Sequence, residues 1–196
     1  VVLRANYTFD VSVHSLWTAW SNGASLCLLP KEALLERGSE LVVVHGVTTM
    51  ALTTSQMGMF RPQRLGSAMR RAIQIGEVLP AAVAEAWSSA GILVVNACGP
   101  TEATVVFTME EHRGQPRFTI GKPFPNARVY VVEPSTLAAV ALLVPGELCV
   151  AGAQVARGYL GRPERTARSF VVNPFLADED GPCGGLGRMY RLGDYS

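Results

Sequence analysis

The sequence predicts an α/β fold in which a parallel sheet with crossover helices is followed by a mainly β portion. Up to about residue 120, apolar runs typical of buried strands alternate with helix-like segments. Beyond it, strand-like segments are separated by turns that contain Pro and Gly, which is typical of a small antiparallel sheet or barrel. We therefore expect an α/β portion over residues 1–120 and a β portion over residues 121–196.

The first expected element is a helix that begins at Asp10 or Ser12, since either side chain can cap its first turn. Four apolar residues then follow the i, i+3, i+4, i+7 spacing of one helix face, and we expect that face to pack on the sheet: Val13, Leu16, Trp17 and Trp20. Gly23 is the expected stop of this helix.

Strand and helix signals alternate after this helix. Short buried strands are expected at Ser25–Leu29 and Leu41–Val44, with a helix at Lys31–Arg37 between them. A helical stretch over residues 55–71 is interrupted by glycine and proline, and Ala72–Ile75 is the next expected strand. This alternation predicts a series of βαβ units and hence a parallel sheet.

The remaining elements continue the series and then change its character. Pro at a first helical position indicates a helix at Ala81–Ser88. Past residue 120, strands are expected at Val129–Glu133 and Glu147–Ala151, and a short helix at Thr166–Phe170. Residues 178–187 are rich in Gly, Asp and Pro, which predicts a surface loop.

A polar turn after a buried strand gives the clearest signal of a ligand site. The apolar run Ile92–Val95 predicts a buried strand, and the Gly99-Pro100 pair then forces a turn. In open α/β sheets ligands bind just past the carboxyl ends of strands. Thr101 and Glu102 therefore stand where phosphate and a divalent cation can be bound. Taken alone, the segment leaves an ordinary polar turn equally open.

Composition excludes several classes of protein. Seventeen basic and sixteen acidic residues give a net charge of +1 without a basic block, which argues against nucleic acid as a partner. The four cysteines are scattered and lack a C-x-x-C pair, which favours a reducing compartment and argues against a zinc site. The longest purely apolar run, Leu137–Val144, is far shorter than the ~20 residues a bilayer span needs. We expect a soluble, cytoplasmic protein with no membrane partner.

Four motifs stand in order along the chain: F-D-V-S at Phe9–Ser12, N-A-C-G-P-T-E at Asn96–Glu102, G-E-L-C-V-A-G-A-Q-V-A-R-G-Y-L at Gly146–Leu160 and Y-R-L-G-D at Tyr190–Asp194. In this order and spacing they resemble the core motifs of nonribosomal peptide synthetase adenylation domains, which belong to the adenylate-forming superfamily. Further matches are I-G-E-V-L at Ile75–Leu79, I-G-K-P-F-P-N at Ile120–Asn126 and R-P-E-R-T-A-R-S-F-V-V-N-P-F at Arg162–Phe175. The resemblance covers nearly the whole chain.

The resemblance implies a fold, a reaction and partners. The chain would be an internal part of one adenylation domain, with a large α/β subdomain followed by part of a small β-barrel-like subdomain. The family's phosphate loop would precede residue 1 and its catalytic lysine would follow residue 196, so we expect the chain alone to be inactive. The full-length enzyme would use ATP and Mg²⁺ to convert an amino acid to aminoacyl-AMP. The acyl group would then pass to the phosphopantetheine thiol of a carrier protein, with carrier-protein and condensation domains of the same megasynthase as partners.

The resemblance also implies roles for individual residues at the nucleotide. Glu102 matches the magnesium-linked glutamate, Thr101 the residue that faces the α-phosphate, and Asp194 the carboxylate that accepts the ribose hydroxyls. The first two are the catalytic candidates. The nucleotide-binding positions that carry over are Gly76, Glu77, Val78, Asn96, Ala97, Cys98, Thr101 and Asp194.

Asp10 matches the aspartate that pairs with the α-ammonium group of the substrate, a charge-assisted contact that selects α-amino acids. The alternative role for Asp10 is a helix cap, which Ser12 can provide instead. The pocket-lining positions that carry over are Asp10, Val11, His14, His45, Ile73, Ile75, Ala97, Val105 and Val106. Two histidines among aliphatic residues predict a medium or large substrate side chain with a hydrogen-bonding or acidic group.

Two positions depart from the family pattern. Cys98 stands where the family usually has a tyrosine that stacks on adenine, and Leu192 where it usually has threonine. These departures leave open a degenerate, non-catalytic binding domain within a megasynthase. An acyl- or aryl-acid-activating ligase of the same superfamily is the other alternative, although such enzymes usually lack an acid at the position of Asp10.

Overall fold

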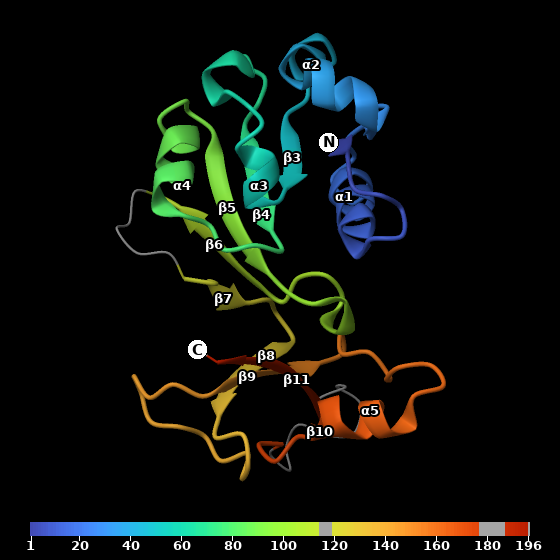
Figure 1. Cartoon of the computed structure of the whole chain (residues 1–196), viewed down its shortest axis with the longest axis vertical. Helices are drawn as coiled ribbons and strands as arrows, with labels where there is room; N and C mark the ends of the chain where they lie inside the picture. The colour runs from blue at the N-terminus through green and yellow to red at the C-terminus, as the bar shows by residue number, and fades with distance from the viewer. Residues whose placement is uncertain (114–118, 177–186, 196) are drawn as a thin grey trace. The chain divides into compact units, whose positions relative to one another are not determined.

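The chain folds into two compact units, which a computed structural model describes over residues 1–113, 119–176 and 187–195 (Figure 1). The first unit contains Val1–Cys98 and Thr108–Lys122. The second contains Gly99–Phe107 and Pro123–Ser196. The segment Gly99–Phe107, which carries the G-P-T-E sequence, therefore folds with the C-terminal part of the chain.

The first unit is built on a sheet whose central strands are parallel. Its strand order is β2-β1-β3-β4-β5-β6-β7. The strands are β1 (Val2–Leu3), β2 (Cys27–Leu28), β3 (Thr49–Leu52), β4 (Arg71–Ile75), β5 (Leu93–Cys98), β6 (Thr108–His112) and β7 (Lys122–Pro123). Strands β1 to β5 pair in parallel, and β6 pairs antiparallel with β5. The predicted α/β class with a parallel sheet is confirmed.

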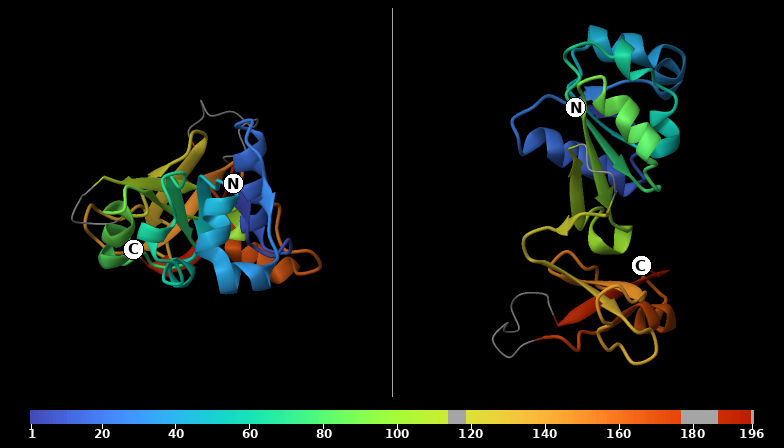
Figure 2. Two further views of the ribbon diagram at one scale, coloured as in Figure 1. Left: turned by 90° about the horizontal axis from the view of Figure 1, so that it is seen from above. Right: turned by 90° about the vertical axis from the view of Figure 1, so that its left-hand side faces the viewer.

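Helices cover both faces of this sheet (Figure 2). On one face lie α2 (Lys31–Val44), α3 (Thr54–Met57) and α4 (Ala81–Ser88), and α1 (Asp10–Trp20) lies on the other. Met50 and Leu52 of β3 form a buried cluster with Met57 of α3 and Trp87 of α4. A short 3₁₀ turn, η1 (Pro62–Arg64), connects α3 to β4.

The inward face of α1 differs from the prediction. Val13, Trp17 and Trp20 are 42%, 62% and 59% exposed, whereas the buried residues of the helix are Ser12, Ser15 and Ala19. Small side chains let a helix lie close to a sheet. The hydroxyls of Ser12 and Ser15 donate to the carbonyls of Tyr7 and Val11 at 3.3 Å and 3.0 Å, so their burial leaves no unpaired hydroxyl.

The cap predicted for α1 is also wrong. Phe9 is the N-cap residue and makes no side-chain cap hydrogen bond. The helix begins at Asp10, one residue after this N-cap. Ser12 lies inside the first turn, with its hydroxyl directed back to the carbonyl of Tyr7.

The strand predicted at Leu41–Val44 is the last turn of α2, because four apolar residues in a row fit a helix as well as a strand. Val42 of this run is buried in the core, and Val44 is 68% exposed. The true strand, β3, follows at Thr49–Leu52. Of the predicted helix over residues 55–71, only α3 and η1 are helical.

Strand β5 and its neighbour also differ from expectation. β5 runs from Leu93 to Cys98, three residues past the predicted end. Asn96 and Ala97 pair with both β4 and β6, and Cys98 pairs with β6 alone. The antiparallel β6 was not predicted. Its sequence, T-M-E-E-H, lacks the alternation of apolar and polar residues that indicates a strand.

The second unit contains a four-stranded antiparallel sheet in the order β10-β11-β9-β8. Its elements are β8 (Ala127–Val132), β9 (Glu147–Gly152), α5 (Pro163–Ser169), β10 (Phe170–Val172) and β11 (Arg188–Tyr195). In the described part of the chain this sheet is open, with β10 and β8 at its edges, so a closed barrel is not shown. Residues 178–186 of the predicted surface loop lie outside the described residues.

An ion pair joins β9 and β11 within this sheet. The Arg191 guanidinium donates from Nε to the Glu147 carboxylate at 2.9 Å and from Nη2 to the carbonyl of Pro134 at 3.0 Å. Glu147 is only 5% exposed. Burial, together with the negative charge of Glu147, raises the pKa of the neighbouring Cys149 thiol to about 11, so that Cys149 stays protonated at neutral pH.

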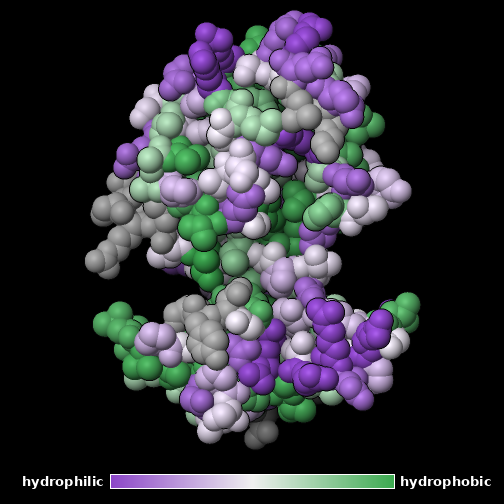
Figure 3. Space-filling view, viewed as in Figure 1, coloured by the Kyte–Doolittle hydropathy of each residue, from purple (hydrophilic) through white to green (hydrophobic). Residues whose placement is uncertain are grey.

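The surface of the second unit is divided by polarity (Figure 3). Arg162, Arg165 and Arg168 are exposed on and beside α5. Leu142 and Leu143, in the connection between β8 and β9, are 91% and 95% exposed. In neither unit is any described helix long and apolar enough to cross a bilayer.

A tight turn after β8 gives the first testable prediction. One Glu133 oxygen accepts hydrogen bonds from the amide and hydroxyl of Ser135 at 3.0 Å and 2.7 Å and from those of Thr136 at 2.6 Å and 2.7 Å. These bonds, with the hydroxyls contributing most, lower the pKa of Glu133 to about 2. A carboxylate with a depressed folded-state pKa stabilises the fold above its unfolded pKa, and this stabilisation is lost as the pH falls towards 2.

We therefore expect Glu133→Gln to lower the urea midpoint of the chain at pH 7 and to have little effect near pH 2. Glu164→Gln is the control, because Glu164 is exposed and lies 3.7 Å from an exposed arginine. A Glu133→Gln deficit that is equal at both pH values would contradict the assignment.

Candidate nucleotide and substrate site

The first unit places several predicted site residues at the carboxyl edge of its parallel strands. Ile75 of β4 pairs with Ala97 of β5, and Ile73 pairs with Val95. Ile73, Ile75 and Ala97 are buried. Because Ala72 faces the core formed with α2 to α4, Ile73 and Ile75 face the side of the sheet that α1 covers. The register therefore brings these three predicted pocket residues together on neighbouring strands.

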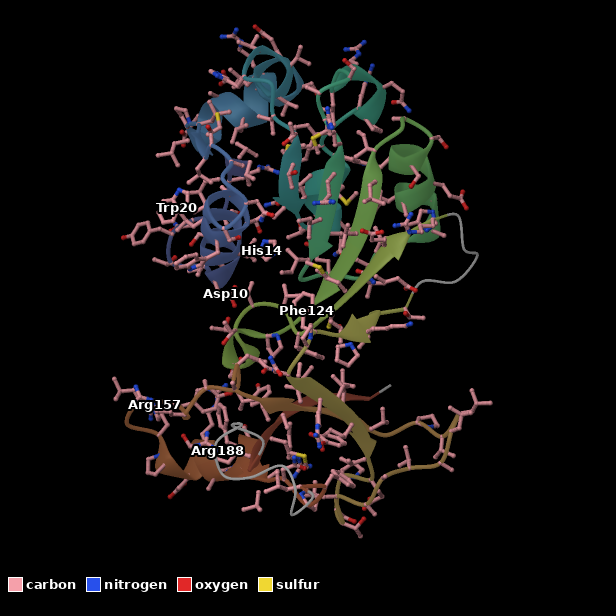
Figure 4. The ribbon with its side chains drawn as sticks, turned by 180° about the vertical axis from the view of Figure 1, so that it is seen from behind. Asp10, His14, Trp20, Phe124, Arg157 and Arg188 are labelled. Atoms are coloured by element: carbon pink, nitrogen blue, oxygen red, sulfur yellow. The ribbon has the colours of Figure 1, made fainter. Side chains whose placement is uncertain are left out.

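Helix α1 adds the polar candidates. Asp10 begins the helix and His14 lies one turn later, with half-buried Val11 between them. Figure 4 shows Asp10 at the end of α1 nearest the strand termini and His14 directed towards the strands, while Trp20 points away. The His14 Nδ1 atom is buried and has no hydrogen-bond partner among the described residues. Burial lowers the pKa of His14, which favours the neutral imidazole.

The structure does not bring His45 to this site. His45 is the exposed C-cap of α2 and precedes β3, so it lies at the amino-terminal side of the strand. The residues that follow β3 at its carboxyl end are Thr53, Thr54 and Ser55. His45 was predicted from the resemblance alone, and its place at the end of α2 does not support that prediction.

A turn after β4 carries Gly76, Glu77 and Val78. Gly76 has a φ of +84°, a conformation that glycine adopts without strain. The Glu77 carboxylate accepts hydrogen bonds from the Ser55 amide at 2.7 Å and the Ser55 hydroxyl at 2.9 Å, which lower the pKa of Glu77. Val78 is 85% exposed.

Two further bonds fix the same turn. Gln74, fully buried on β4, donates to the carbonyl of Glu77 at 2.5 Å, and the Thr54 hydroxyl donates to the carbonyl of Val78 at 2.7 Å. Ser55, Thr54 and Gln74 were not predicted as site residues. The polar T-T-S sequence directly after an apolar strand was the signal that could have identified two of them.

Strand β5 ends with the predicted adenine contacts. The Asn96 amide donates to the carbonyl of Thr119 at 2.7 Å. Ala97 is buried and Cys98 is half-buried. These three residues belong to the strand itself, whereas Gly99 begins the segment that folds with the second unit.

In the second unit, the segment Gly99–Phe107 folds tightly on itself. A Cβ added at Gly99 would lie 2.5 Å from the Val105 carbonyl oxygen and 2.6 Å from the Val106 Cα, so only glycine fits here. Val105 and Val106 are buried, and Val105 has a φ of +70°. The compact segment presents the 3₁₀ turn η2 (Thr101–Ala103), in which Thr101 is exposed.

Backbone contacts hold η2 against the segment after β9. The Ala156 amide donates to the carbonyl of Glu102 at 2.8 Å, and the Thr104 hydroxyl donates to the carbonyl of Gln154 at 2.6 Å. Arg188 in turn donates to the carbonyls of Ala156 and Arg157 at 2.6 Å and 2.8 Å.

The Glu102 side chain has a direct partner. The Tyr159 hydroxyl donates to Glu102 Oε1 at 2.5 Å, and the Tyr190 hydroxyl lies 3.4 Å from that of Tyr159. Burial raises the pKa of Tyr190, and its contact with the Tyr159 hydroxyl and the charge of Glu102 raise it further. The Tyr190 phenol is therefore neutral at physiological pH. Tyr159 was not predicted as a site residue, although it lies in the A-R-G-Y-L motif.

The described residues contain no group of three or more His, Cys, Asp or Glu side chains that could hold a metal ion by themselves. Glu102 supplies one carboxylate. This donor set fits Mg²⁺, which keeps several waters and is usually bound through one or two carboxylates and substrate phosphates. The side chain of the predicted ribose ligand, Asp194, lies outside the described residues, although its backbone belongs to β11.

Comparisons with known proteins extend over the same residues. The profile of a family described as "AMP-binding enzyme" matches residues 1–160. Nonribosomal peptide synthetase 7 of Aspergillus fumigatus is 33% identical over 196 residues, which cover 98% of this chain and 8% of that protein. Tyrocidine synthase 2 of Brevibacillus parabrevis is 33% identical over 198 residues, which cover 97% of this chain and 5% of that protein.

A solved structure shows the same fold. The AMPPNP-bound form of the nonribosomal peptide synthetase FmoA3 matches with a TM-score of 0.85 and 27% identity, over 99% of this chain and 21% of that chain. The chain thus spans a small part of each protein that it matches. From the profile match over residues 1–160 and this structural agreement, the chain belongs to the AMP-binding enzyme family, and its relatives are the adenylation domains of nonribosomal peptide synthetases.

Proposed function

We propose that this chain is the substrate-selecting and nucleotide-binding part of an amino-acid adenylation domain. In the reaction, an amino-acid carboxylate attacks the α-phosphorus of ATP, which gives aminoacyl-AMP and releases pyrophosphate. The acyl group then passes to the phosphopantetheine thiol of a carrier-protein domain in a cytoplasmic megasynthase that also contains condensation domains. Asp10 is the observation that carries the proposal, because it places a carboxylate where α1 meets the carboxyl edge of the sheet.

Asp10 would make the site selective for amino acids over carboxylic acids that lack an amino group. A carboxylate attracts the α-ammonium group through a charge-assisted hydrogen bond, whereas an aryl or fatty acid offers no cation to pair with it. Phe9, not Asp10, is the N-cap residue of α1, and Asp10 is the first residue of the helix. The second carboxylate of the proposed site, Glu102, would lie at the phosphates of ATP.

The chemical step requires positioning and charge stabilisation more than covalent chemistry. Two anions, the amino-acid carboxylate and the triphosphate, must be held in line, and negative charge must be stabilised at phosphorus. We assign the Thr101 hydroxyl to the α-phosphate and the Glu102 carboxylate to Mg²⁺, which when bound offsets phosphate charge. The exposed position of Thr101 at the start of η2 suits contact with a ligand.

We assign the adenine to the turn Gly76–Val78 and the end of β5. Gly76 has no side chain to obstruct a flat ring, and hydrogen bonds from Ser55 and Gln74 hold the turn in place. Asn96, Ala97 and Cys98 would provide edge and face contacts, and Asp194 would accept the ribose hydroxyls. AMPPNP bound to the related synthetase FmoA3 supports nucleotide binding as the role of this fold.

The proposed side-chain pocket combines an apolar wall with one polar group. Ile73, Ile75 and Ala97 would form the wall in the first unit. The resemblance to the family adds Val11, Val105 and Val106 as lining residues. His14 supplies the polar group through its buried, unpartnered Nδ1. A buried polar atom without a partner is costly, so a substrate hydrogen-bonding group there would be favoured. His45 has no part in this pocket.

The test is amino-acid-dependent exchange of pyrophosphate into ATP by the full-length protein that carries this chain. We expect exchange with an amino acid whose side chain is medium or large and has a hydrogen-bonding or acidic group. Asp10→Asn, which keeps the shape but removes the charge, should raise the KM for the amino acid at least tenfold, the range of a lost charge-assisted bond. The KM for ATP should stay within twofold.

Two results would contradict this assignment. Exchange with small aliphatic amino acids only would exclude the polar pocket. Exchange with aryl or fatty acids that Asp10→Asn leaves intact would show that the chain belongs to an acid-activating ligase. Asp178→Asn is the matched control, because it removes the same charge in a part of the sequence without any of the motifs.

A further inference from the structure

We propose that Tyr159 is a positioning residue for the Glu102 carboxylate and thereby sets the affinity of the site for the divalent cation. This inference rests on the proposed function, because it assumes that Glu102 binds Mg²⁺. Its basis is the 2.5 Å hydrogen bond from the Tyr159 hydroxyl to Glu102 Oε1. Tyr159 does not touch the cation in this arrangement. It acts by fixing the orientation of the residue that does.

The hydrogen bond and metal binding are compatible. A carboxylate has two oxygens with about four lone-pair sites, so Oε1 can accept from a phenol while other lone pairs remain for a cation. Glu102 lies in a short 3₁₀ turn, and its side chain alone has three rotatable bonds. Without the Tyr159 hydroxyl, the Glu102 side chain would lose its rotational freedom only when the cation binds. This entropy loss would lower the affinity for the cation.

Tyr159 is itself held rigidly. Its ring packs edge-on against Phe170 at a centroid distance of 5.4 Å, and the Arg165 guanidinium lies 4.3 Å from the centre of the ring. Phe170 packs against Tyr190 at 5.0 Å. The Tyr159 amide donates to the Thr166 hydroxyl at 2.9 Å. Because these contacts fix the Tyr159 ring, its hydroxyl can hold the Glu102 carboxylate in one orientation.

The arrangement also links three segments that are far apart in the sequence. Glu102 comes from the G-P-T-E motif, Tyr159 from A-R-G-Y-L and Tyr190 from Y-R-L-G-D. The backbone bond from Ala156 to the Glu102 carbonyl makes the same connection three residues before Tyr159. The main chain and side chain of Glu102 are therefore both anchored to one segment, which is the geometry that a precise metal ligand requires.

The test compares Tyr159→Phe with Tyr130→Phe in the full-length protein. Tyr130→Phe is the matched control, since Tyr130 belongs to the same unit, stacks on Phe175 at 4.6 Å and accepts a hydrogen bond at its hydroxyl from Asn173 at 3.5 Å. Tyr159→Phe keeps the ring and removes the hydroxyl. We expect it to raise the Mg²⁺ concentration for half-maximal exchange about tenfold, the lower end for lost support of a metal ligand. The KM for the amino acid should not change.

A second readout does not depend on turnover. Binding of Mn²⁺ in the presence of AMPPNP, measured by electron paramagnetic resonance, should weaken by the same factor in Tyr159→Phe and stay unchanged in Tyr130→Phe. Equal Mn²⁺ affinities in the two variants would overturn the inference. So would a loss in Tyr159→Phe that affects the amino-acid KM and the melting temperature as much as the metal affinity.

Glu102→Asp completes a double-mutant cycle, because its shorter side chain cannot reach the tyrosine from the same backbone. We expect the double variant Glu102→Asp/Tyr159→Phe to be no weaker in metal binding than Glu102→Asp alone. Full additivity would show that the hydroxyl acts independently of the carboxylate, which overturns the inference. If Glu102→Gln leaves the metal requirement unchanged, the metal role of Glu102 in the proposed function fails as well.

Discussion

Under the proposed function, Gly99→Ala is expected to lower kcat/KM for amino-acid activation about a hundredfold, although it adds only one methyl group. The new Cβ would lie 2.5 Å from the carbonyl oxygen of Val105 and 2.6 Å from the Cα of Val106. Both obstacles are backbone atoms, which cannot move aside as a flexible side chain can. The segment must therefore open, and Thr101 and Glu102 move with it. A displacement of about 1 Å in a positioned catalytic group can cost two orders of magnitude in rate.

Pyrophosphate exchange by the full-length protein measures this effect. Gly187→Ala is the matched control, because a Cβ at Gly187 would meet no atom of the described residues within 4 Å. We expect the control to retain activity within twofold. Activity of Gly99→Ala close to that of the parent would show that the segment tolerates the shift, and would weaken the assignment of Thr101 and Glu102 to the reacting phosphates.

Arg191→Ala is expected to destabilise the chain by about 3 kcal/mol, as found when one partner of a buried ion pair is removed. Glu147 is 5% exposed, and the Arg191 side chain, at 27%, supplies its charge partner. Arg191 also donates to the carbonyl of Pro134 at 3.0 Å. Removing the guanidinium leaves a buried carboxylate without a counter-charge and a carbonyl without this donor, and both are costly.

Urea unfolding of the chain and its variants measures this loss. Arg168→Ala is the control, because the pair Arg168–Glu164 is 3.7 Å apart and both side chains are largely exposed, so we expect a change below about 0.5 kcal/mol. The double variant Arg191→Leu/Glu147→Leu should recover most of the lost stability, since apolar residues of similar size often replace a buried pair without loss. A single Arg191→Ala variant as stable as Arg168→Ala would refute the argument.

The sequence predicted the elements whose signals are local. Helix α4 has the predicted bounds, Ala81–Ser88, although Pro80 is its N-cap residue and not its first helical residue. β4 and β9 differ from their predicted bounds by one residue. The predictions failed where two structures share one pattern. The apolar run Leu41–Val44 is helical because α2 continues through it, and no local residue distinguishes a buried helix turn from a short strand.

The candidate site shows the same division. Thr101 and Glu102 could be singled out from the sequence because they follow a recognisable strand and turn. Asp10 was identified through the resemblance of the F-D-V-S motif. Tyr159, which the structure adds, contacts Glu102 across 57 positions of sequence, and no periodicity reveals such a pair. His45, which was predicted from the resemblance, lies instead before the amino-terminal end of β3.

The two tryptophans on the outer face of α1 can report by their fluorescence whether this face is covered. The chain has three tryptophans, and the structure divides them into two environments. Trp87 is 2% exposed beside Phe60, so its indole emits from an apolar medium, whereas Trp17 and Trp20 are 62% and 59% exposed and emit from water. The indoles of Trp17 and Trp20 lie edge to face at 6.2 Å. Any partner or chain segment that covers α1 would shift the emission of these two indoles to shorter wavelength, without an added label.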